Sequence, residues 1–241
     1  MSSEQGMLAR SSLWVVLTCL CFLAPNAYAW IPSADVMERK LDTHRRPAIN
    51  VRIELESVAK SEAPVSYAEV VSTKAGVLVL REHHLGDGAV HVKRWQTGHK
   101  DASKARRNAP EWLQWLTGKK AHAMFRDLAL DRKTVSLARD GRNVLWVAGA
   151  TAHEPTRPQV HLERESGILR KIVQIREERI VIASFNGRFV VEQSPTHWPS
   201  VITIKDGERT ITYKVVRVLE KAPLTDIDLA PQVIKPLEES R

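Results

Sequence analysis

The chain has 241 residues and a formal net charge of +8 at pH 7, with 36 Lys and Arg against 28 Asp and Glu. Both cysteines, Cys19 and Cys21, lie inside the first apolar run, so the composition of the remaining chain excludes a cysteine nucleophile and a thiolate metal site. About 210 residues follow that run, enough for one single-core domain without disulfide bonds.

The N-terminal residues have the pattern of a secretory signal peptide. Arg10 precedes an apolar run at residues 13–24, and a short polar stretch then leads to Ala27-Tyr28-Ala29. An apolar core of about a dozen residues is too short for a membrane span, and an Ala-x-Ala site predicts cleavage, here after Ala29. We therefore predict a signal peptide at residues 1–29 and a single domain at residues 30–241, exported to the bacterial periplasm without a lipid anchor. An uncleaved signal anchor is the alternative.

The next segment has the signals of a short helix. Ser33 can cap it, and Val36, Met37 and Leu41 form an apolar stripe along one side. Pro47 prevents the helix from continuing.

A helical insert is expected at residues 108–129. Asn108 can cap its first helix, Gly118 closes that helix, and a second helix follows. Apolar residues recur at spacings of three and four, which predicts one buried side for each helix: Trp112, Leu113, Trp115, Leu116, Ala121, Met124, Phe125 and Leu128.

Almost all of the remaining chain has the pattern of antiparallel strands. Residues 50–58 alternate strictly, with Val51, Ile53 and Leu55 on one face, which predicts a half-buried strand. Asn-Gly and Asp-Gly pairs are strong signals for hairpin turns between such strands. The expected strands are residues 50–58, 67–72, 77–81, 89–95, 134–138, 143–148, 159–164, 168–175, 180–185, 188–192, 201–205 and 210–219, with a loop of about four residues between the last two.

A long antiparallel meander with few helices has to curl or close, because its second face and its edges would otherwise stay uncovered. A filled sandwich is one outcome, and a curved half-barrel under the helices is the other. Trp95, Trp112 and Trp115 favour the half-barrel, since they lie in or next to the helical insert, although ordinary core packing also explains them. We predict a mainly β (α+β) fold, a curved antiparallel half-barrel of about 11 strands with a short N-terminal helix and a helical lid.

Motifs for catalysis are mostly absent. The sequence has no Gly-x-Ser-x-Gly elbow, no phosphate-binding loop ending in Gly-Lys-Ser or Gly-Lys-Thr, and no His-Glu-x-x-His, so we expect neither an enzyme nor a cofactor. Glu82, His83, His84, Asp87 and His91 are of residue types that ligate metals. Neighbouring residues of a strand point to opposite faces, however, so we expect a solvated strand end and no metal site.

Basic residues concentrate between Lys93 and Lys120. In an exported protein such a segment fits anionic lipid headgroups or an acidic protein partner, and we expect no nucleic-acid partner. A solvated loop that keeps the protein soluble is the alternative.

Four features of the chain together carry a family resemblance. The first is the signal peptide followed at once by a short helix and an alternating strand, and the second is the helical insert after the fourth strand. The third is Leu145-Trp146-Val147-Ala148-Gly149 with the later segments 158–163 and 166–170. The fourth is Trp198-Pro199 before a hairpin, with a later segment at 223–229 that lacks the phenylalanine of the family pattern. These features resemble the LolA/LolB-like periplasmic lipoprotein carriers, the outer-membrane lipoprotein-sorting family.

The resemblance implies a carrier that shields acyl chains in an apolar cavity while they cross an aqueous compartment. Each methylene group kept from water contributes about 0.8 kcal/mol, so such a cavity can compete with a membrane for the chain. The implied cargo is an acylated lipoprotein or a phospholipid, with an inner-membrane donor and an outer-membrane acceptor, and we expect a monomer. Arg52 is the nearest match to a family arginine that helps to hold the lid. The candidate lining residues, chosen on residue type and position, are Trp95, Trp112, Trp115, Leu116, Phe125, Leu128 and Trp146.

The second hypothesis is an envelope signalling or scaffold module that uses the same fold to bind a protein partner, with a filled core and no ligand. A visible cavity would favour the carrier. A packed interior beside an exposed apolar patch would favour the module.

Overall fold

The computed structural model describes residues 31–43, 50–58, 65–73, 77–85, 88–96, 109–151, 154, 156–176, 178–194 and 196–223. The chain separates into two compact units, Met1–Ile31 and Pro32–Arg241, and every element below belongs to the second. The predicted signal peptide lies outside the described residues, as do Pro47, Asp87 and Asn108.

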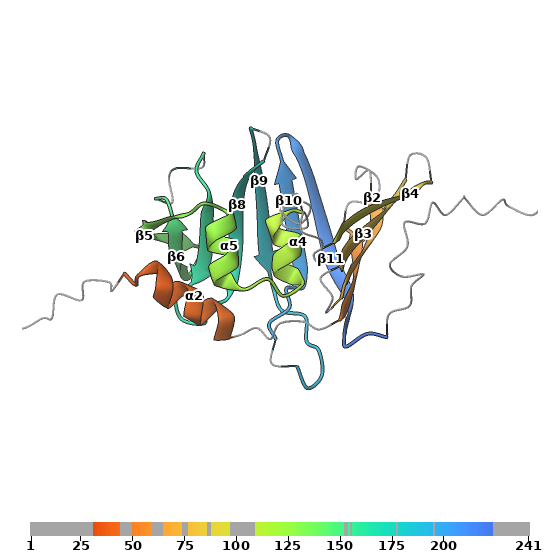
Figure 1. Cartoon of the computed structure of the whole chain (residues 1–241), viewed down its shortest axis with the longest axis horizontal. Helices are drawn as coiled ribbons and strands as arrows, with labels where there is room; N and C mark the ends of the chain where they lie inside the picture. The colour runs from red at the N-terminus through yellow and green to blue at the C-terminus, as the bar shows by residue number, and fades with distance from the viewer. Residues whose placement is uncertain are drawn as a thin grey trace, which may run out of the picture. The chain divides into compact units, whose positions relative to one another are not determined.

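The described part of the second unit consists of three helices and eleven strands (Figure 1). In chain order these are α2 (Ala34–Thr43), β1 (Val51–Ser57), β2 (Val65–Ser72), β3 (Val77–His84), β4 (Val90–Gln96), α4 (Glu111–Leu116), α5 (Ala121–Asp127), β5 (Asp131–Asp140), β6 (Asn143–Gly149), β7 (Gln159–Glu163), β8 (Leu169–Arg176), β9 (Arg179–Asn186), β10 (Val201–Asp206) and β11 (Arg209–Glu220). Among them no helix is long and apolar enough to cross a membrane.

All eleven strands form one curved antiparallel sheet in the order β4-β3-β2-β1-β11-β10-β9-β8-β7-β6-β5. Two meanders, β1 to β4 and β5 to β11, meet where the first strand pairs with the last, with Val51 opposite Glu220 and Ser57 opposite Tyr213. The two edge strands, β4 and β5, are neighbours in the chain, so the segment between them has to pass from one edge of the sheet to the other. That segment contains α4 and α5, which lie over one face of the sheet (Figure 1).

The face under the helices, here called the inner face, follows from the alternation of β1. Val51, Ile53 and Leu55 are buried in one cluster with residues of α2, α4 and α5, whereas Arg52 and Glu54 point to the outer face. The predicted fold class is therefore confirmed, from the short N-terminal helix through the curved sheet to the helices over its inner face.

Two details of the predicted strands are wrong. Residues 188–192 do not form a strand, since Phe189 makes only an isolated bridge with Trp198. The chain there is a wide loop between β9 and β10, in which the indole of Trp198 donates to Glu220 Oε1 at 2.8 Å. The turn between β10 and β11 has two residues where a loop of about four was expected, because Asp206 and Arg209 still pair.

On β7 the side chains of the outer face are buried as well. His161 is 4% exposed and Gln159 is 2% exposed. The Gln159 Oε1 atom lies 2.8 Å from His161 Nε2, and the Gln159 amide nitrogen donates to the Thr151 carbonyl at 3.3 Å and to that of Glu154. Burial and, to a smaller extent, the charge of Lys171 lower the pKa of His161 from 6.5 to about 4.

We expect His161 to make the protein less stable as the pH falls from 6.5 to 4. In this window the unfolded chain binds a proton at this imidazole and the folded chain does not, so the free energy of unfolding decreases by about 3 kcal/mol and then levels off. Urea unfolding of the wild type and of His161→Gln across this pH range measures the effect, because glutamine cannot titrate. His122→Gln is the control, since the side chain of His122 is 67% exposed. If the wild type and His161→Gln show the same pH dependence, the imidazole is accessible to protons in the folded state.

Candidate functional site

Helix α4 is buried on every side. All six of its residues are buried, including Trp112 and Trp115, which leaves this helix no solvent-facing stripe. Its first backbone N–H, that of Glu111, donates to the Gln174 side-chain oxygen on β8 at 3.1 Å. The helix is thus fixed to the sheet by this polar contact at its N-terminus and by apolar packing along its length.

An ion triad with a buried Lys119–Glu111 pair joins α4 to α5. Lys119 Nζ lies 2.7 and 2.8 Å from the two carboxylate oxygens of Glu111 and 2.9 Å from Asp127 Oδ2. The side chains of Lys119 and Glu111 are 7% and 3% exposed. Burial alone would raise the pKa of Asp127, but the hydrogen bonds from Lys119 and Arg126 outweigh it and hold that pKa below its ordinary value. The lid helices therefore form one unit as long as these carboxylates are ionised.

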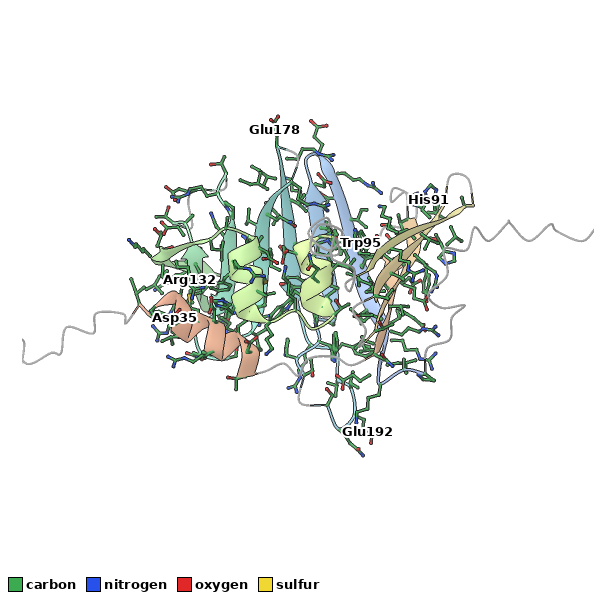
Figure 2. The ribbon with its side chains drawn as sticks, in the orientation of Figure 1. Asp35, His91, Trp95, Arg132, Glu178 and Glu192 are labelled. Carbon is green, nitrogen blue, oxygen red and sulfur yellow. The ribbon has the colours of Figure 1, made fainter. Side chains whose placement is uncertain are left out.

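Helix α2 holds the other end of α5. Asp42 Oδ1 accepts the first backbone N–H of α5, that of Ala121, at 3.0 Å. Glu38 contacts His122 Nδ1 at 3.2 Å and is bound by Arg132 of β5, which also bonds Asp35. Figure 2 shows Arg132 beside Asp35 at this helix. Polar contacts of α2 thus fix both α5 and the edge strand β5.

The structure brings the candidate lining residues into one apolar cluster. Trp95 on β4 is half-buried and packs against this cluster (Figure 2). The other six are buried members of it, with at most 7% of each residue exposed: Trp112, Trp115, Leu116, Phe125, Leu128 and Trp146. Their role in ligand binding remains a prediction.

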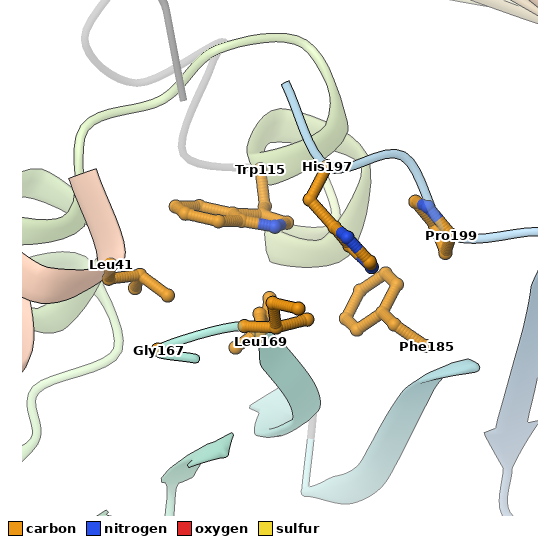
Figure 3. Close-up of a pocket in the computed structure, with 8 residues that line it drawn as sticks. Leu41, Trp115, Gly167, Leu169, Phe185, His197 and Pro199 are labelled. Carbon is orange, nitrogen blue, oxygen red and sulfur yellow. The ribbon is translucent and has the colours of Figure 1, made fainter. Parts of the chain in front are cut away.

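One pocket opens between α2, α4 and the sheet. Leu41, Trp115, Leu169 and Phe185 surround it, and His197 stands at its side (Figure 3). Its volume is about 20 Å³, which is room for a single water and too little for an acyl chain. Of the candidate lining residues, Trp115 alone borders this pocket. In the sequence, Leu41 stands out only as part of a helical stripe and Leu169 only as part of the motif segment 166–170, and no motif contains Phe185.

The inner face carries a group of polar side chains at one end of β3 and β4. Glu82 accepts a bond from Lys93 Nζ at 3.1 Å and another from the hydroxyl of Tyr213. Burial, followed by the charge of Glu82, raises the pKa of Tyr213. Tyr213 is on β11, which is the third strand along the sheet from β3, the strand of Glu82. In a flat sheet β3 and β11 would lie about 14 Å apart. The bond is thus a measure of how strongly the sheet curves.

The histidines of this region divide between the two faces, as alternation predicts. His84 and His91 stack on the inner face with ring centroids 4.2 Å apart. His83 points outward against Tyr67, at 5.3 Å between centroids. In the part of the chain that the structure describes, no group of three or more His, Cys, Asp or Glu is placed to hold a metal ion.

Arg52 does not hold the lid, and that prediction is wrong. Its side chain points to the outer face, where Nε lies 3.1 Å from Glu69 Oε1, and Arg81 bonds the other oxygen of the same carboxylate at 2.5 Å. The alternation of β1 places Arg52 on the side opposite to Val51 and Ile53, and therefore away from α4 and α5. On the same face, burial and then the charges of Glu54 and Glu69 raise the pKa of Tyr67 to about 12.

No family model matches the chain, and neither does any curated protein. Three solved structures are similar to it. A LolA superfamily protein from Nitrosomonas europaea has 10% identity and a TM-score of 0.47, over 83% of this chain and 98% of that one. A DUF1329 family protein from Desulfovibrio piger has 6% identity and a TM-score of 0.43, over 82% and 95%.

The third is an outer membrane lipoprotein-sorting protein domain from Vibrio parahaemolyticus, with 9% identity and a TM-score of 0.39 over 82% of this chain and 95% of that one. At these identities the likeness concerns the fold alone.

Proposed function

We propose that the chain is a periplasmic carrier, without enzymatic activity, that shields the acyl chains of a lipoprotein or phospholipid between its lid helices and the inner face of its sheet. The observation that supports this function is the mainly apolar interface under α4 and α5. Four tryptophans contribute to it or pack against it: Trp95, Trp112, Trp115 and Trp146. The sequence motifs that resemble the lipoprotein carriers support the same function.

Uptake of an acyl chain requires α4 and α5 to move away from the sheet. The polar links between these helices and their surroundings include Glu111 to Gln174, Asp42 to Ala121 and Glu38 to His122. An acyl chain that enters between helix and sheet replaces one apolar contact by another, so the apolar surface stays out of water throughout. The cost of opening then comes mainly from such polar links, at about 1 kcal/mol for each hydrogen bond.

Native mass spectrometry of protein purified from the periplasm, followed by lipid analysis, tests this function. We expect phospholipid or an acylated peptide to be released in stoichiometric amount. The control is the same protein stripped of lipid and incubated with vesicles of phosphatidylethanolamine and phosphatidylglycerol, which should restore the mass of the complex. A clean apo mass before and after incubation would refute a lipid carrier.

A second candidate is the envelope signalling or scaffold module. The pocket beside Trp115 is too small for an acyl chain, and such a module needs no ligand. Val190 is the most exposed large apolar side chain of the described residues, at 73%, and is the residue that we expect such a partner to contact. A lipid-free protein that still captures one envelope protein, and loses it on Val190→Asp, would support this module.

A further inference from the structure

Two inner-face strands change from apolar to polar at the same end of the sheet. On β1 the inward series ends with Leu55 and then Ser57, and on β3 it ends with Leu80, Glu82 and His84. The alternation itself is unbroken, so the side chains of these polar residues point to the inner face, which is the face that α4 and α5 cover. Such a change from apolar to polar residues within one face marks the end of the apolar surface.

Contacts across the curved sheet gather these residues. Tyr213 stands opposite Ser57 in the register of β1 and β11, and its hydroxyl reaches Glu82. Glu82 also accepts from Lys93, and His84 pairs with the first residue of β2. Ser57, Glu82, His84, Lys93 and Tyr213 are called the polar end here. Ser57 and Tyr213 are each 2% exposed, so the polar end is enclosed by protein where β1 meets β11.

Two buried polar atoms of the polar end have no hydrogen-bond partner: Ser57 Oγ and His84 Nε2. A polar group that is left buried and unpaired destabilises the protein, so a ligand or a water that completes its hydrogen bond is favoured there. A serine hydroxyl can donate, and so can an imidazole nitrogen that carries its proton. Both atoms can therefore bond to an oxygen of a ligand.

The charges of the polar end determine whether a charged or a neutral ligand oxygen is favoured there. Glu82 is paired with Lys93, and the charge of Glu82 acts on Tyr213 more strongly than that of Arg209, which lies further along the inward series of β11. An anion bound at Ser57 would lie near the carboxylate of Glu82 and be repelled by it. A neutral hydrogen-bond acceptor meets no such repulsion.

We propose that the polar end binds the carbonyl of a neutral acyl ester or amide, the point at which an acyl chain joins its headgroup. This inference rests on the proposed carrier function and adds the chemistry of the headgroup end. The acyl chain then runs from the polar end along the apolar series of β1 and β3, so that Leu55 and Leu80 meet its first methylene groups.

Binding of two lipids with the same chain, monooleoylglycerol and oleate, tests the proposal. We expect the purified protein to bind the ester about tenfold more tightly than the carboxylate, measured by titration calorimetry below the micelle concentration. Ser57→Ala should weaken binding of the ester about fivefold and change oleate binding less. His84→Phe, which keeps an aromatic ring against His91, should act in the same direction.

Ser72→Ala is the matched control. Ser72 is 3% exposed and lies on the inner face at the opposite end of β2, beside Val51, so its loss should leave both affinities unchanged. Tighter binding of oleate than of the ester, or equal effects of Ser57→Ala and Ser72→Ala, would overturn the assignment of the polar end and leave a lipid carrier in place. Failure to bind either lipid would overturn the carrier and this inference together.

Discussion

Replacing Trp115 with alanine is expected to lower the free energy of unfolding by about 3–5 kcal/mol, the usual cost of removing a buried indole. Trp115 is 7% exposed and lies between Leu41 of α2 and Leu169 of β8, so its removal leaves space that α2, α4 and the sheet cannot all collapse into. Together with the existing pocket this space is on the order of 150 Å³, a size that stays dry and takes up a benzene molecule.

Urea unfolding and thermal melting with and without benzene measure both parts of this prediction. We expect benzene to raise the melting temperature of Trp115→Ala and to leave that of the wild type unchanged, because the wild-type pocket is too small. Ile175→Ala is the control, since Ile175 is 45% exposed and its truncation should change stability by less than about 0.5 kcal/mol. A Trp115→Ala variant as stable as this control would mean that α4 does not pack on the sheet as described.

Replacing Lys119 with alanine is expected to destabilise the protein by about 3–5 kcal/mol, because it leaves the buried carboxylate of Glu111 without its cation. The double variant Lys119→Ala with Glu111→Gln should recover most of this loss, since no unpaired charge remains. Lys120→Ala is the matched control, because the neighbouring Lys120 is exposed and belongs to no ion pair that the described residues show.

The stability that Asp127 contributes to this triad depends on pH. The pKa of its carboxyl is lower in the folded chain than in the unfolded chain, so the contribution is complete above the ordinary carboxyl pKa and is lost as the pH falls through the folded value. Melting curves of the wild type and of Asp127→Asn below pH 4 should therefore converge. Curves that stay a constant distance apart down to pH 2 would show that Lys119 does not hold this carboxylate ionised.

Much of the fold could be predicted from local patterns in the sequence. The strict alternation of β1 fixed its buried face, and Asp140-Gly141 marks the tight turn between β5 and β6 where it was expected. Residues 188–192 were wrongly predicted as a strand because they include β-branched residues, which are typical of strands. A strand also needs a partner along its length, and in this segment only Phe189 pairs. The pairing of β1 with β11 left no local signal, since it joins residues from the two ends of the domain.

The site was harder to predict than the fold. Apolar residues at helical spacing identified Trp112 and Trp115 as buried, but spacing does not show whether a buried ring borders a pocket or packs in a core. The assignment of Arg52 ignored the alternation that already placed it on the outer face. The sequence marked Glu82 and His84 only as possible metal ligands. The polar end was not recognised as one group because its members come from four strands, and curvature of the sheet, which brings Tyr213 to Glu82, has no signature in the sequence.

The pairing of the first strand with the last also governs how this chain has to fold. A chain that is synthesised or exported from its N-terminus completes the meander of β1 to β4 while β11 is still missing, so β1 is for that time an open edge. Its apolar residues would invite another chain to pair there, and the charges of Arg52, Glu54 and Glu56 alternate with them along the strand. Contacts between distant parts of a chain also form slowly. We therefore expect refolding on the time scale of seconds, with the sheet closing at its centre last and with aggregation competing until it does.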